Sequence, residues 1–343
     1  MKLSLSRFAT PLRCLLALAA STAIARAEEG ALEVTPTNHL DRQAKDTGGK
    51  LDYMLQEVQQ IKTGVVMSNF REEYGDHVRM KRVEFPTLAP ERETIPGYIF
   101  MPKDMPAGKK YPGIVMVHGG NHTQLASYWF DLIEETVRHG YVVIFPEYRG
   151  SSGHGESIYQ SNYGVSDLTD VRACTAYLAG LTYIDADRLG IVGHSRGGML
   201  SMRTLEEEPK RFKAAVDVAG LKDMVAFMSY KTDARRQEIA EDKHYGGKLP
   251  NQKLDAYIDV SPAFFVEKIE TPVLVLSTTG DTTVPYQLHN RRFIEALKAY
   301  NKVFDSHLYE NAPGSHMFLF ADSADAQDAR RRIFEWLGKY LKP

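Results

Sequence analysis

Residues 189–200, LGIVGHSRGGML, decide the interpretation of this chain. They begin as a continuous apolar run, which is typical of a strand buried on both faces of a parallel sheet. Ser195 follows in a Gly-x-Ser-x-Gly pattern, and the residues after it favour a helix. A strand that turns directly into a helix strains the corner residue, and the flanking glycines remove side chains that would collide there. We therefore expect the Ser195 hydroxyl at the carboxyl edge of a sheet, beside the positive end of the outgoing helix.

Strand and helix patterns alternate on both sides of this motif. Two strands joined by a Pro- and Glu-rich turn are expected first, at 77–85 and 97–102. Short buried strands are then expected at 113–117, 141–150, 188–195, 214–220, 272–281 and 302–310. Helical patterns occur at 50–62, 126–140, 166–180, 196–208, 287–299 and 324–341. This alternation predicts an α/β fold, with a mostly parallel sheet between two layers of helices.

One segment, roughly 221–271, interrupts the alternation and has no strand pattern. It is rich in helix formers and in large apolar side chains, among them Met224, Phe227, Met228, Tyr230, Tyr245, Phe264 and Phe265. An insertion here would lie over the carboxyl ends of the strands, where open α/β sheets hold their ligands. We expect a helical cap. Phe227 and Tyr230 are candidate substrate-binding residues, although the same aromatics could fill the core of the cap itself.

A serine hydroxyl is a poor nucleophile without a base, and the base needs an acid to orient it. In this architecture the partners follow in the order serine, acid, histidine. Asp281, in GDTTVP, comes directly after a buried strand, and His316, in NAPGSHMF, lies in a loop after the last strand. His289 and His307 are expected inside a helix and a strand. We therefore predict a triad of Ser195, Asp281 and His316.

Acyl transfer also needs two N–H groups that meet the negative charge on the carbonyl oxygen. One candidate is the backbone N–H of Arg196, the residue after the nucleophile. The other comes from the loop HGGN at 118–121, where Gly120 is the first choice and Asn121 the second. These three residues form the predicted oxyanion hole.

Two further loops have alternative interpretations. HGGNH could be read as a metal-binding pair, His118 and His122, but the glycines oppose a helix and no third ligand is evident. PEYRGSSGHGES, at 146–157, lacks the lysine of a phosphate-binding loop. Tyr148 in this loop either lines the substrate site or locks the loop in place. We expect no metal and no cofactor.

The N-terminus has the features of an export signal. Lys2, Arg7 and Arg13 precede or begin a short apolar stretch, and a small-residue exit, ARA, ends at Ala27. We expect residues 1–27 to be removed and the protein to be periplasmic or secreted. The apolar run is shorter than the ~20 residues that a membrane span needs, and no later segment is long enough.

Composition limits the remaining possibilities. The chain has 343 residues, of which 43% are hydrophobic and 25% charged, as in a soluble globular protein. Without residues 1–27, and so without four basic residues, 38 basic and 44 acidic residues remain, a net charge of −6. This mild acidity indicates no nucleic-acid partner. Cys174 would then be the single cysteine, so no internal disulfide is expected.

The ordered blocks YPGIVMVHGG, FPEYRGSSGHGES, LGIVGHSRGGML, SPAFFVEKIETPVLVLSTTGDTTVP and GSHMF resemble the catalytic domain of the prolyl oligopeptidase family of α/β-hydrolases. The resemblance covers about 111–343 and implies Ser195 as nucleophile, Asp281 as acid and His316 as base. Peptidases of that family usually carry a β-propeller, which residues 28–110 are too few to form. The HGGP-like loop of the family reads HGGN here, and the acidic pair of its aminopeptidases is not evident.

The sequence therefore predicts an N-terminal extension at 28–76 and an α/β-hydrolase domain at 77–343. We expect a serine hydrolase that works through an acyl-enzyme, a peptidase for short peptides or related amides and esters. A carboxylesterase for small esters is the alternative. A non-catalytic binding protein on the same fold is the alternative from another class. The sequence leaves the oligomeric state open.

Overall fold

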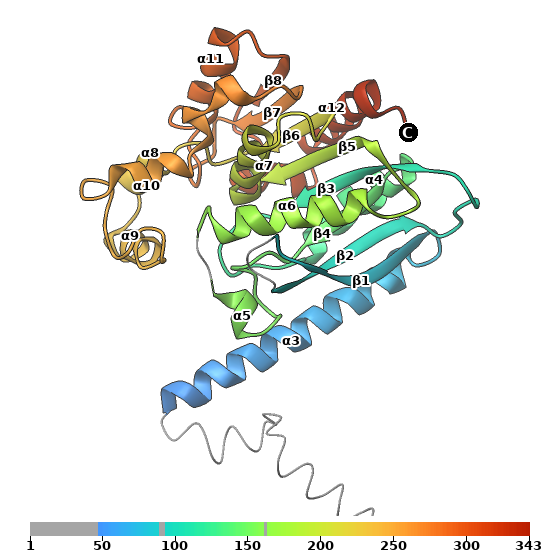
Figure 1. Ribbon diagram of the computed structural model, residues 1–343, viewed down its shortest axis with the longest axis horizontal. Helices are drawn as coiled ribbons and strands as arrows, with labels where there is room; N and C mark the ends of the chain where they lie inside the picture. The colour runs from blue at the N-terminus through green and yellow to red at the C-terminus, as the bar shows by residue number, and fades with distance from the viewer. Residues whose placement is uncertain (1–46, 89–92, 161–162) are drawn as a thin grey trace, which may run out of the picture. The chain divides into compact units, whose positions relative to one another are not determined.

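The computed structural model describes residues 47–88, 93–160 and 163–343 (Figure 1). The expected signal peptide and the first part of the expected extension lie outside these residues, so the signal and the export that it implies stay predictions. No described helix is both long and apolar enough to cross a membrane.

By its internal contacts the chain separates into two units, Met1–Glu57 and Val58–Pro343. Helix α3 (Thr47–Tyr74) begins in the first unit, and every other described element belongs to the second. The predicted domain boundary at residue 77 stays a prediction.

The described strands form one eight-stranded sheet in the order β1-β2-β4-β3-β5-β6-β7-β8. β1 and β2 pair antiparallel, as do β2 and β4, and all neighbouring pairs from β4 onward are parallel. The strands are β1 (Val78–Pro86), β2 (Thr94–Pro102), β3 (Tyr111–Val117), β4 (Val142–Pro146), β5 (Ile184–His194), β6 (Ala214–Val218), β7 (Val273–Thr278) and β8 (Phe304–Tyr309). The predicted, mostly parallel sheet is confirmed.

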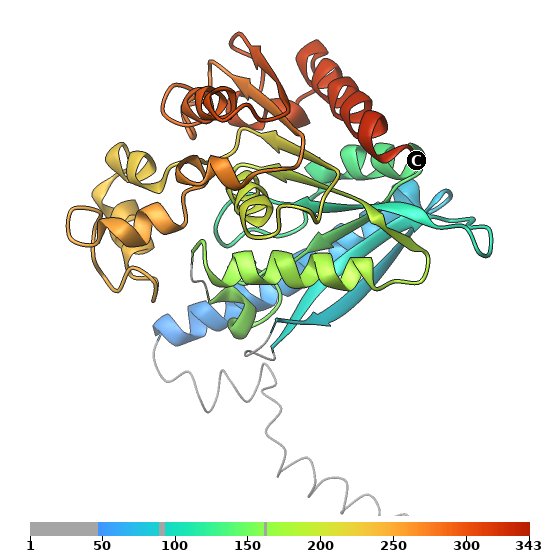
Figure 2. The same cartoon turned by 45° about the horizontal axis from the view of Figure 1, so that its top comes forward.

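Helices cover both faces of the sheet, and each face has its own core. Neighbouring strand residues point to opposite faces, so in β3 Val115 joins the core that includes α6 and α7, whereas Ile114 joins the core that includes α4 and α12. Figure 2 shows α6 and α12 on opposite sides of the sheet. The main helices are α4 (Phe130–Arg138), α6 (Ser166–Ala179), α7 (Arg196–Glu207), α11 (Asn290–Ala299) and α12 (Ala324–Leu341).

Helix α3 is longer than the helix expected at 50–62 because its later part finds apolar partners. The Phe70 ring is fully buried, 4.8 Å from the ring of Phe100 and 5.0 Å from that of Phe130. This contact fixes the end of the helix on one core. The opposite face of the helix carries exposed apolar side chains, among them Val58, Ile61 and Val65.

The segment between β6 and β7 folds as short helices, which confirms the predicted helical cap. The cap contains α8 (Met224–Ser229), α9 (Asp233–Ala240), α10 (Leu254–Asp259), and the 3-10 helices η3 (Pro262–Phe264) and η4 (Val266–Lys268). Tyr245 and Tyr257 are buried and stack with their rings 4.4 Å apart. These two tyrosines therefore fill the core of the cap.

The last strand, β8, is less buried than its sequence pattern predicts. The pattern at 302–310 predicts a buried strand, whereas β8 is half exposed and Leu308 has 39% of its surface exposed. The reason is its position, because β8 is the outermost strand and pairs only with β7 within the described sheet.

Candidate active site

Ser195 stands at the sharp turn between β5 and α7. Its backbone has φ 60° and ψ −120°, a strained conformation for a residue with a side chain. A Cβ atom at Gly197 would lie 2.0 Å from the carbonyl oxygen of Val117, and one at Gly193 would lie 2.3 Å from that of Gly197. Both flanking positions therefore accept only glycine, which is the physical reason for the Gly-x-Ser-x-Gly pattern.

Hydrogen bonds hold this turn from two sides. The Ser195 N–H donates to the carbonyl oxygen of Val218, at the end of β6, at 3.0 Å. The Leu221 N–H, at the start of the cap segment, donates to the Ser195 carbonyl oxygen at 3.1 Å. The nucleophile candidate is thus fixed to the neighbouring strand and to the beginning of the cap.

The structure brings Ser195, His316 and Asp281 together in a line. His316 Nε2 lies 2.8 Å from Ser195 Oγ, and His316 Nδ1 lies 2.7 Å from Asp281 Oδ2. A carboxylate only accepts hydrogen bonds, so Nδ1 carries the proton and Nε2 is free to accept the proton of the serine hydroxyl. The three residues lie in the segments that follow β5, β7 and β8 at the carboxyl edge of the sheet.

Asp281, the candidate acid, is held by its own loop. Asp281 Oδ1 accepts the N–H groups of Thr283 and Val284 at 2.9 and 2.8 Å, so Oδ2 faces the imidazole. Ser315 Oγ donates to the carbonyl oxygen of Gly280 at 2.6 Å. The loop that carries His316 is therefore bound directly to the loop that carries Asp281.

His194 binds the backbone of His316, the candidate base, a contact that the sequence did not indicate. Its Nε2 lies 2.9 Å from the carbonyl oxygen of His316, and since a carbonyl only accepts, Nε2 carries the proton. Burial, together with the nearby His316, lowers the pKa of His194 to about 3, which keeps the ring neutral. His194 occupies the first x of Gly-x-Ser-x-Gly, a position that accepts many residue types, so the motif did not indicate this contact.

His289 and Tyr230 support the acid loop. His289 lies in the turn before α11 and not inside the helix as expected. The N–H of Lys222 donates to its Nδ1 at 3.4 Å, so Nε2 carries the proton and donates to Tyr230 Oη at 2.7 Å. Tyr230 Oη donates in turn to the carbonyl oxygen of Thr283 at 3.2 Å. Burial, followed by the charge of Lys222, lowers the pKa of His289 to about 3.

The three candidate substrate-binding residues lie in different surroundings. The Phe227 ring is nearly buried and packs 5.7 Å from the half-buried ring of Tyr230, and substrate contact by these two residues stays a prediction. The Tyr148 side chain is fully buried, and its contact with a substrate stays a prediction. Its Oη donates to the carbonyl oxygen of His118 at 2.8 Å and its ring stacks 4.3 Å from the His118 ring, so it locks the loop.

The loop with the predicted oxyanion donors passes directly beside Ser195. A Cβ atom at Gly119 would lie 2.7 Å from the Cβ of Ser195. Gly120 has φ 79°, which favours glycine, and the side chain of Asn121 contacts Arg196. The use of the Arg196, Gly120 or Asn121 N–H groups by a substrate oxygen stays a prediction.

The two histidines of this loop have separate environments. His118 is buried, and its Nδ1 and Nε2 lie 3.0 Å from the carbonyl oxygen of Gly119 and 3.1 Å from Ser151 Oγ. The His122 ring stacks on that of Tyr159, with centroids 3.8 Å apart. Among the described residues no group of three His, Cys, Asp or Glu side chains could hold a metal ion.

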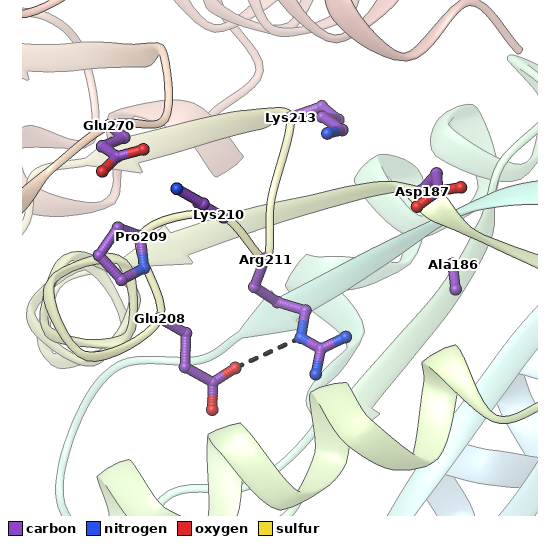
Figure 3. A pocket seen from close by; sticks show the side chains of 8 residues that line it. All are labelled: Ala186, Asp187, Glu208, Pro209, Lys210, Arg211, Lys213 and Glu270. Carbon is purple, nitrogen blue, oxygen red and sulfur yellow. Dashed lines mark hydrogen bonds and ion pairs between the residues drawn. The ribbon is translucent and has the colours of Figure 1, made fainter.

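A cavity of about 470 Å³ lies away from these residues (Figure 3). Lys213 directly precedes β6, so the cavity opens near the amino ends of the strands, opposite the edge that carries Ser195. Acidic and basic side chains balance in its lining, which consists of Ala186, Asp187, Glu208, Pro209, Lys210, Arg211, Lys213 and Glu270. This cavity is separate from the candidate active site.

The curated proteins to which this chain is similar in sequence include peptidases. The chain is 28% identical over 209 residues to the acylamino-acid-releasing enzyme of Mus musculus, covering 59% of this chain and 28% of that protein. It is 29% identical over 217 residues to the uncharacterized peptidase YuxL of Bacillus subtilis, covering 60% of this chain and 31% of that protein. The chain thus spans about a third of the length of these relatives.

Solved structures share the fold. An acylaminoacyl peptidase in complex with Z-Gly-Gly-Phe-chloromethyl ketone has a TM-score of 0.64 at 20% identity, over 78% of this chain and 42% of that one. A puromycin-hydrolyzing peptidase of Mycobacterium tuberculosis has a TM-score of 0.63 at 23% identity, over 77% and 39%. The described strands all lie in one sheet, so the described part of the chain contains no β-propeller. Residues 128–343 match the prolyl oligopeptidase family, and the chain therefore belongs to this family.

Proposed function

We propose that this protein is a serine peptidase that cleaves short peptides or related amides through an acyl-enzyme, with Ser195, His316 and Asp281 as its triad. The observation that carries the proposal is the unbroken series of hydrogen bonds from Ser195 Oγ through both nitrogens of His316 to Asp281 Oδ2, at 2.8 and 2.7 Å. The series ends at a strained serine beside the N-terminus of α7.

In the first half of the reaction, His316 Nε2 takes the hydroxyl proton while Ser195 Oγ attacks the carbonyl carbon. The carbonyl oxygen becomes negative and is met by the N–H of Arg196 and by Gly120 or Asn121 of the neighbouring loop. The tetrahedral intermediate then breaks the bond to the leaving amine, which receives the proton from His316. Asp281 stabilises the imidazolium and keeps its proton on Nδ1.

In the second half, water replaces the amine. His316 Nε2 removes a proton from the water as its oxygen attacks the acyl carbon, and the same proton returns to Ser195 Oγ when the ester bond breaks. The acid product leaves and the free enzyme is restored. No step needs a cofactor.

The substrate class follows from the family and the cap. Proteins with this fold include an acylaminoacyl peptidase and a puromycin-hydrolyzing peptidase, which favours small amide substrates. Phe227 lies in α8 of the cap and Tyr230 directly follows this helix. Their rings would present aromatic surface to the acyl group. Small esters are the second candidate, because the same triad cleaves esters and amides and the pocket sets the choice.

Steady-state kinetics on peptide anilides and p-nitrophenyl esters test this function. Ser195→Ala should lower kcat by at least about a thousandfold on both. Ser229→Ala, at an exposed serine of α8, is the matched control and should keep wild-type rates. An anilide rate within about a hundredfold of the ester rate supports a peptidase, because amides need more transition-state stabilisation. Activity that survives in Ser195→Ala would overturn the proposal.

A further inference from the structure

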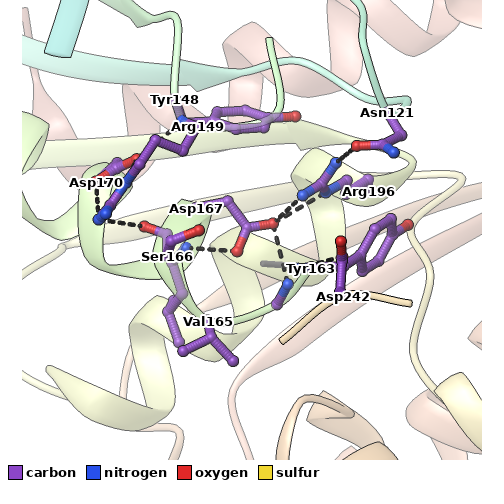
Figure 4. Close-up of polar contacts among 12 residues, drawn as sticks. Asn121, Tyr148, Arg149, Tyr163, Val165, Ser166, Asp167, Asp170, Arg196 and Asp242 are labelled. Carbon is purple, nitrogen blue, oxygen red and sulfur yellow. Dashed lines mark hydrogen bonds and ion pairs between the residues drawn. The ribbon is translucent and has the colours of Figure 1, made fainter. Parts of the chain in front are cut away.

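The side chain of Arg196 is buried next to the proposed nucleophile and donates hydrogen bonds to two different segments (Figure 4). Its Nε and one terminal nitrogen donate to Asp167 Oδ2 of α6 at 2.9 and 2.5 Å. Its other terminal nitrogen donates to Asn121 Oδ1 at 2.7 Å and to the carbonyl oxygen of Gly120 at 3.3 Å. The guanidinium therefore connects the loop of the predicted oxyanion donors to a helix.

Asp167 is a fixed partner for this guanidinium. It is fully buried, and it accepts the N–H groups of Gly164 and Leu168 at 3.1 and 2.9 Å. The N-cap of α6 is Val165, and the Asp167 carboxylate faces Arg196. A buried ion pair tolerates little movement, because its attraction offsets desolvation only in good geometry.

The cap reaches the same guanidinium through Tyr163. The ring of Tyr163 lies 3.9 Å from the guanidinium carbon of Arg196. Both backbone groups of Tyr163 are bound by the cap: its N–H donates to Asp242 Oδ2 at 2.8 Å, and its carbonyl oxygen accepts from Tyr245 Oη at 3.0 Å. A displacement of the cap would therefore move the ring that supports Arg196.

We propose that Arg196 is a positioning residue. Its side chain holds the Gly120–Asn121 loop in place for the transition state and links this loop to the cap. The inference rests on the proposed function. The bond to the Gly120 carbonyl oxygen orients the Gly120–Asn121 peptide plane, and with it the Asn121 N–H. The bond to Asn121 Oδ1 fixes the next residue of the loop.

A guanidinium suits this position because its planar fork donates to several acceptors at once. A lysine offers one compact ammonium and cannot bind Asp167 with two nitrogens while it reaches Asn121 and Gly120. Arg196→Lys keeps the backbone N–H of residue 196 and the positive charge beside Asp167. This substitution therefore separates the positioning role of the side chain from its charge.

Arg149→Lys is the matched control. Arg149 forms a buried ion pair with Asp170, also on α6, through Nε at 3.0 Å and a terminal nitrogen at 2.8 Å. It is the same kind of pair on the same helix (Figure 4). Asn121→Ala is the second test variant, because it removes one acceptor of Arg196 at a half-exposed position and leaves the pair with Asp167 intact.

The readouts are kcat per titrated active site, KM, and the inhibition constant of a peptide trifluoromethyl ketone, whose adduct carries an oxyanion. Loss of one oxyanion donor costs about 10²–10³ in kcat, so a displaced loop should cost about tenfold to a hundredfold in Arg196→Lys and about threefold to tenfold in Asn121→Ala. The inhibition constant should rise by the same factor while KM changes less than about threefold. If the Arg196 side chain only stabilised the fold, the substitutions would lower the number of active sites that can be titrated but would leave kcat per site and the inhibition constant unchanged.

Arg149→Lys should keep kcat and the inhibition constant within about threefold of the wild type. The inference is overturned if both test variants keep wild-type values per titrated site, or if Arg149→Lys loses as much as they do. If Arg196→Lys does not fold, Asn121→Ala decides alone by the same criteria. Failure of the proposed function would look different, because turnover would then persist in Ser195→Ala.

Discussion

Replacement of His289 by glutamine should remove part of the acid sensitivity of the folded protein. His289 is fully buried and bound to Tyr230 and to the N–H of Lys222. Burial lowers its pKa from the ordinary 6.5 to about 3. Below pH 6.5 the unfolded chain therefore binds a proton at this residue, whereas the folded protein does not until the pH approaches 3.

The size of the effect follows from these two values. Where the unfolded state binds more protons, the free energy of unfolding falls as the pH falls. For one histidine with these pKa values, the loss between pH 7.5 and pH 5 is about 2 kcal/mol. Glutamine does not titrate, and its amide can still donate to Tyr230. The variant should thus lose about 2 kcal/mol less than the wild type over this interval.

Urea unfolding at pH 7.5 and pH 5, followed by tryptophan fluorescence, measures this difference. His139→Gln, at an exposed position, is the control and should behave like the wild type. If His289→Gln and the wild type lose the same free energy between the two pH values, within about 0.5 kcal/mol, His289 does not remain neutral in the folded protein. The argument from its burial would then be refuted.

Three further predictions concern the sharp turn between β5 and α7 that carries Ser195 (the elbow), the loop that carries Asp281 (the acid loop) and the N-terminus. Gly197→Ala places a Cβ 2.0 Å from the carbonyl oxygen of Val117 and should cost at least about 3 kcal/mol of stability; a melting temperature equal to that of the wild type would contradict the elbow geometry. Tyr230→Phe keeps the ring but removes the bond to the Thr283 carbonyl oxygen, and should lower kcat about threefold to tenfold with little change in KM; a change confined to KM would indicate that the hydroxyl contacts the substrate and does not act through the acid loop. We also propose export after cleavage behind Ala27, so N-terminal sequencing of the exported protein should begin at Glu28, and an intact N-terminus would exclude it.

The sheet and the meeting of three distant side chains could be predicted because each leaves a local pattern. Buried strands read as short apolar runs, and the carboxyl ends of parallel strands meet at one edge. Ser195 and Asp281 follow such strands and His316 follows the edge strand β8, so the parallel topology places all three at one edge. The exposure of β8 could not be predicted, because the residues of one strand do not indicate whether that strand lies inside the sheet or at its edge.

The contacts around the triad could not be predicted because they join residues without a shared local pattern. Arg196 entered the sequence interpretation through its backbone N–H, whereas its side chain binds Asp167 on another helix. The fully buried position of Tyr148 follows from the His118 ring stacked on it. His194 lies inside the motif, yet its partner is a carbonyl oxygen 122 residues away. Such contacts depend on the packed fold.

The most direct measurement is the site of covalent attachment of an acylating or phosphonylating probe. A fluorophosphonate should add once per chain, and peptide mapping by mass spectrometry should place the adduct on Ser195. The rate of attachment should collapse in His316→Ala, since the imidazole that activates the hydroxyl is gone. An adduct on a different residue, or equally fast labelling without the His316 side chain, would contradict the account.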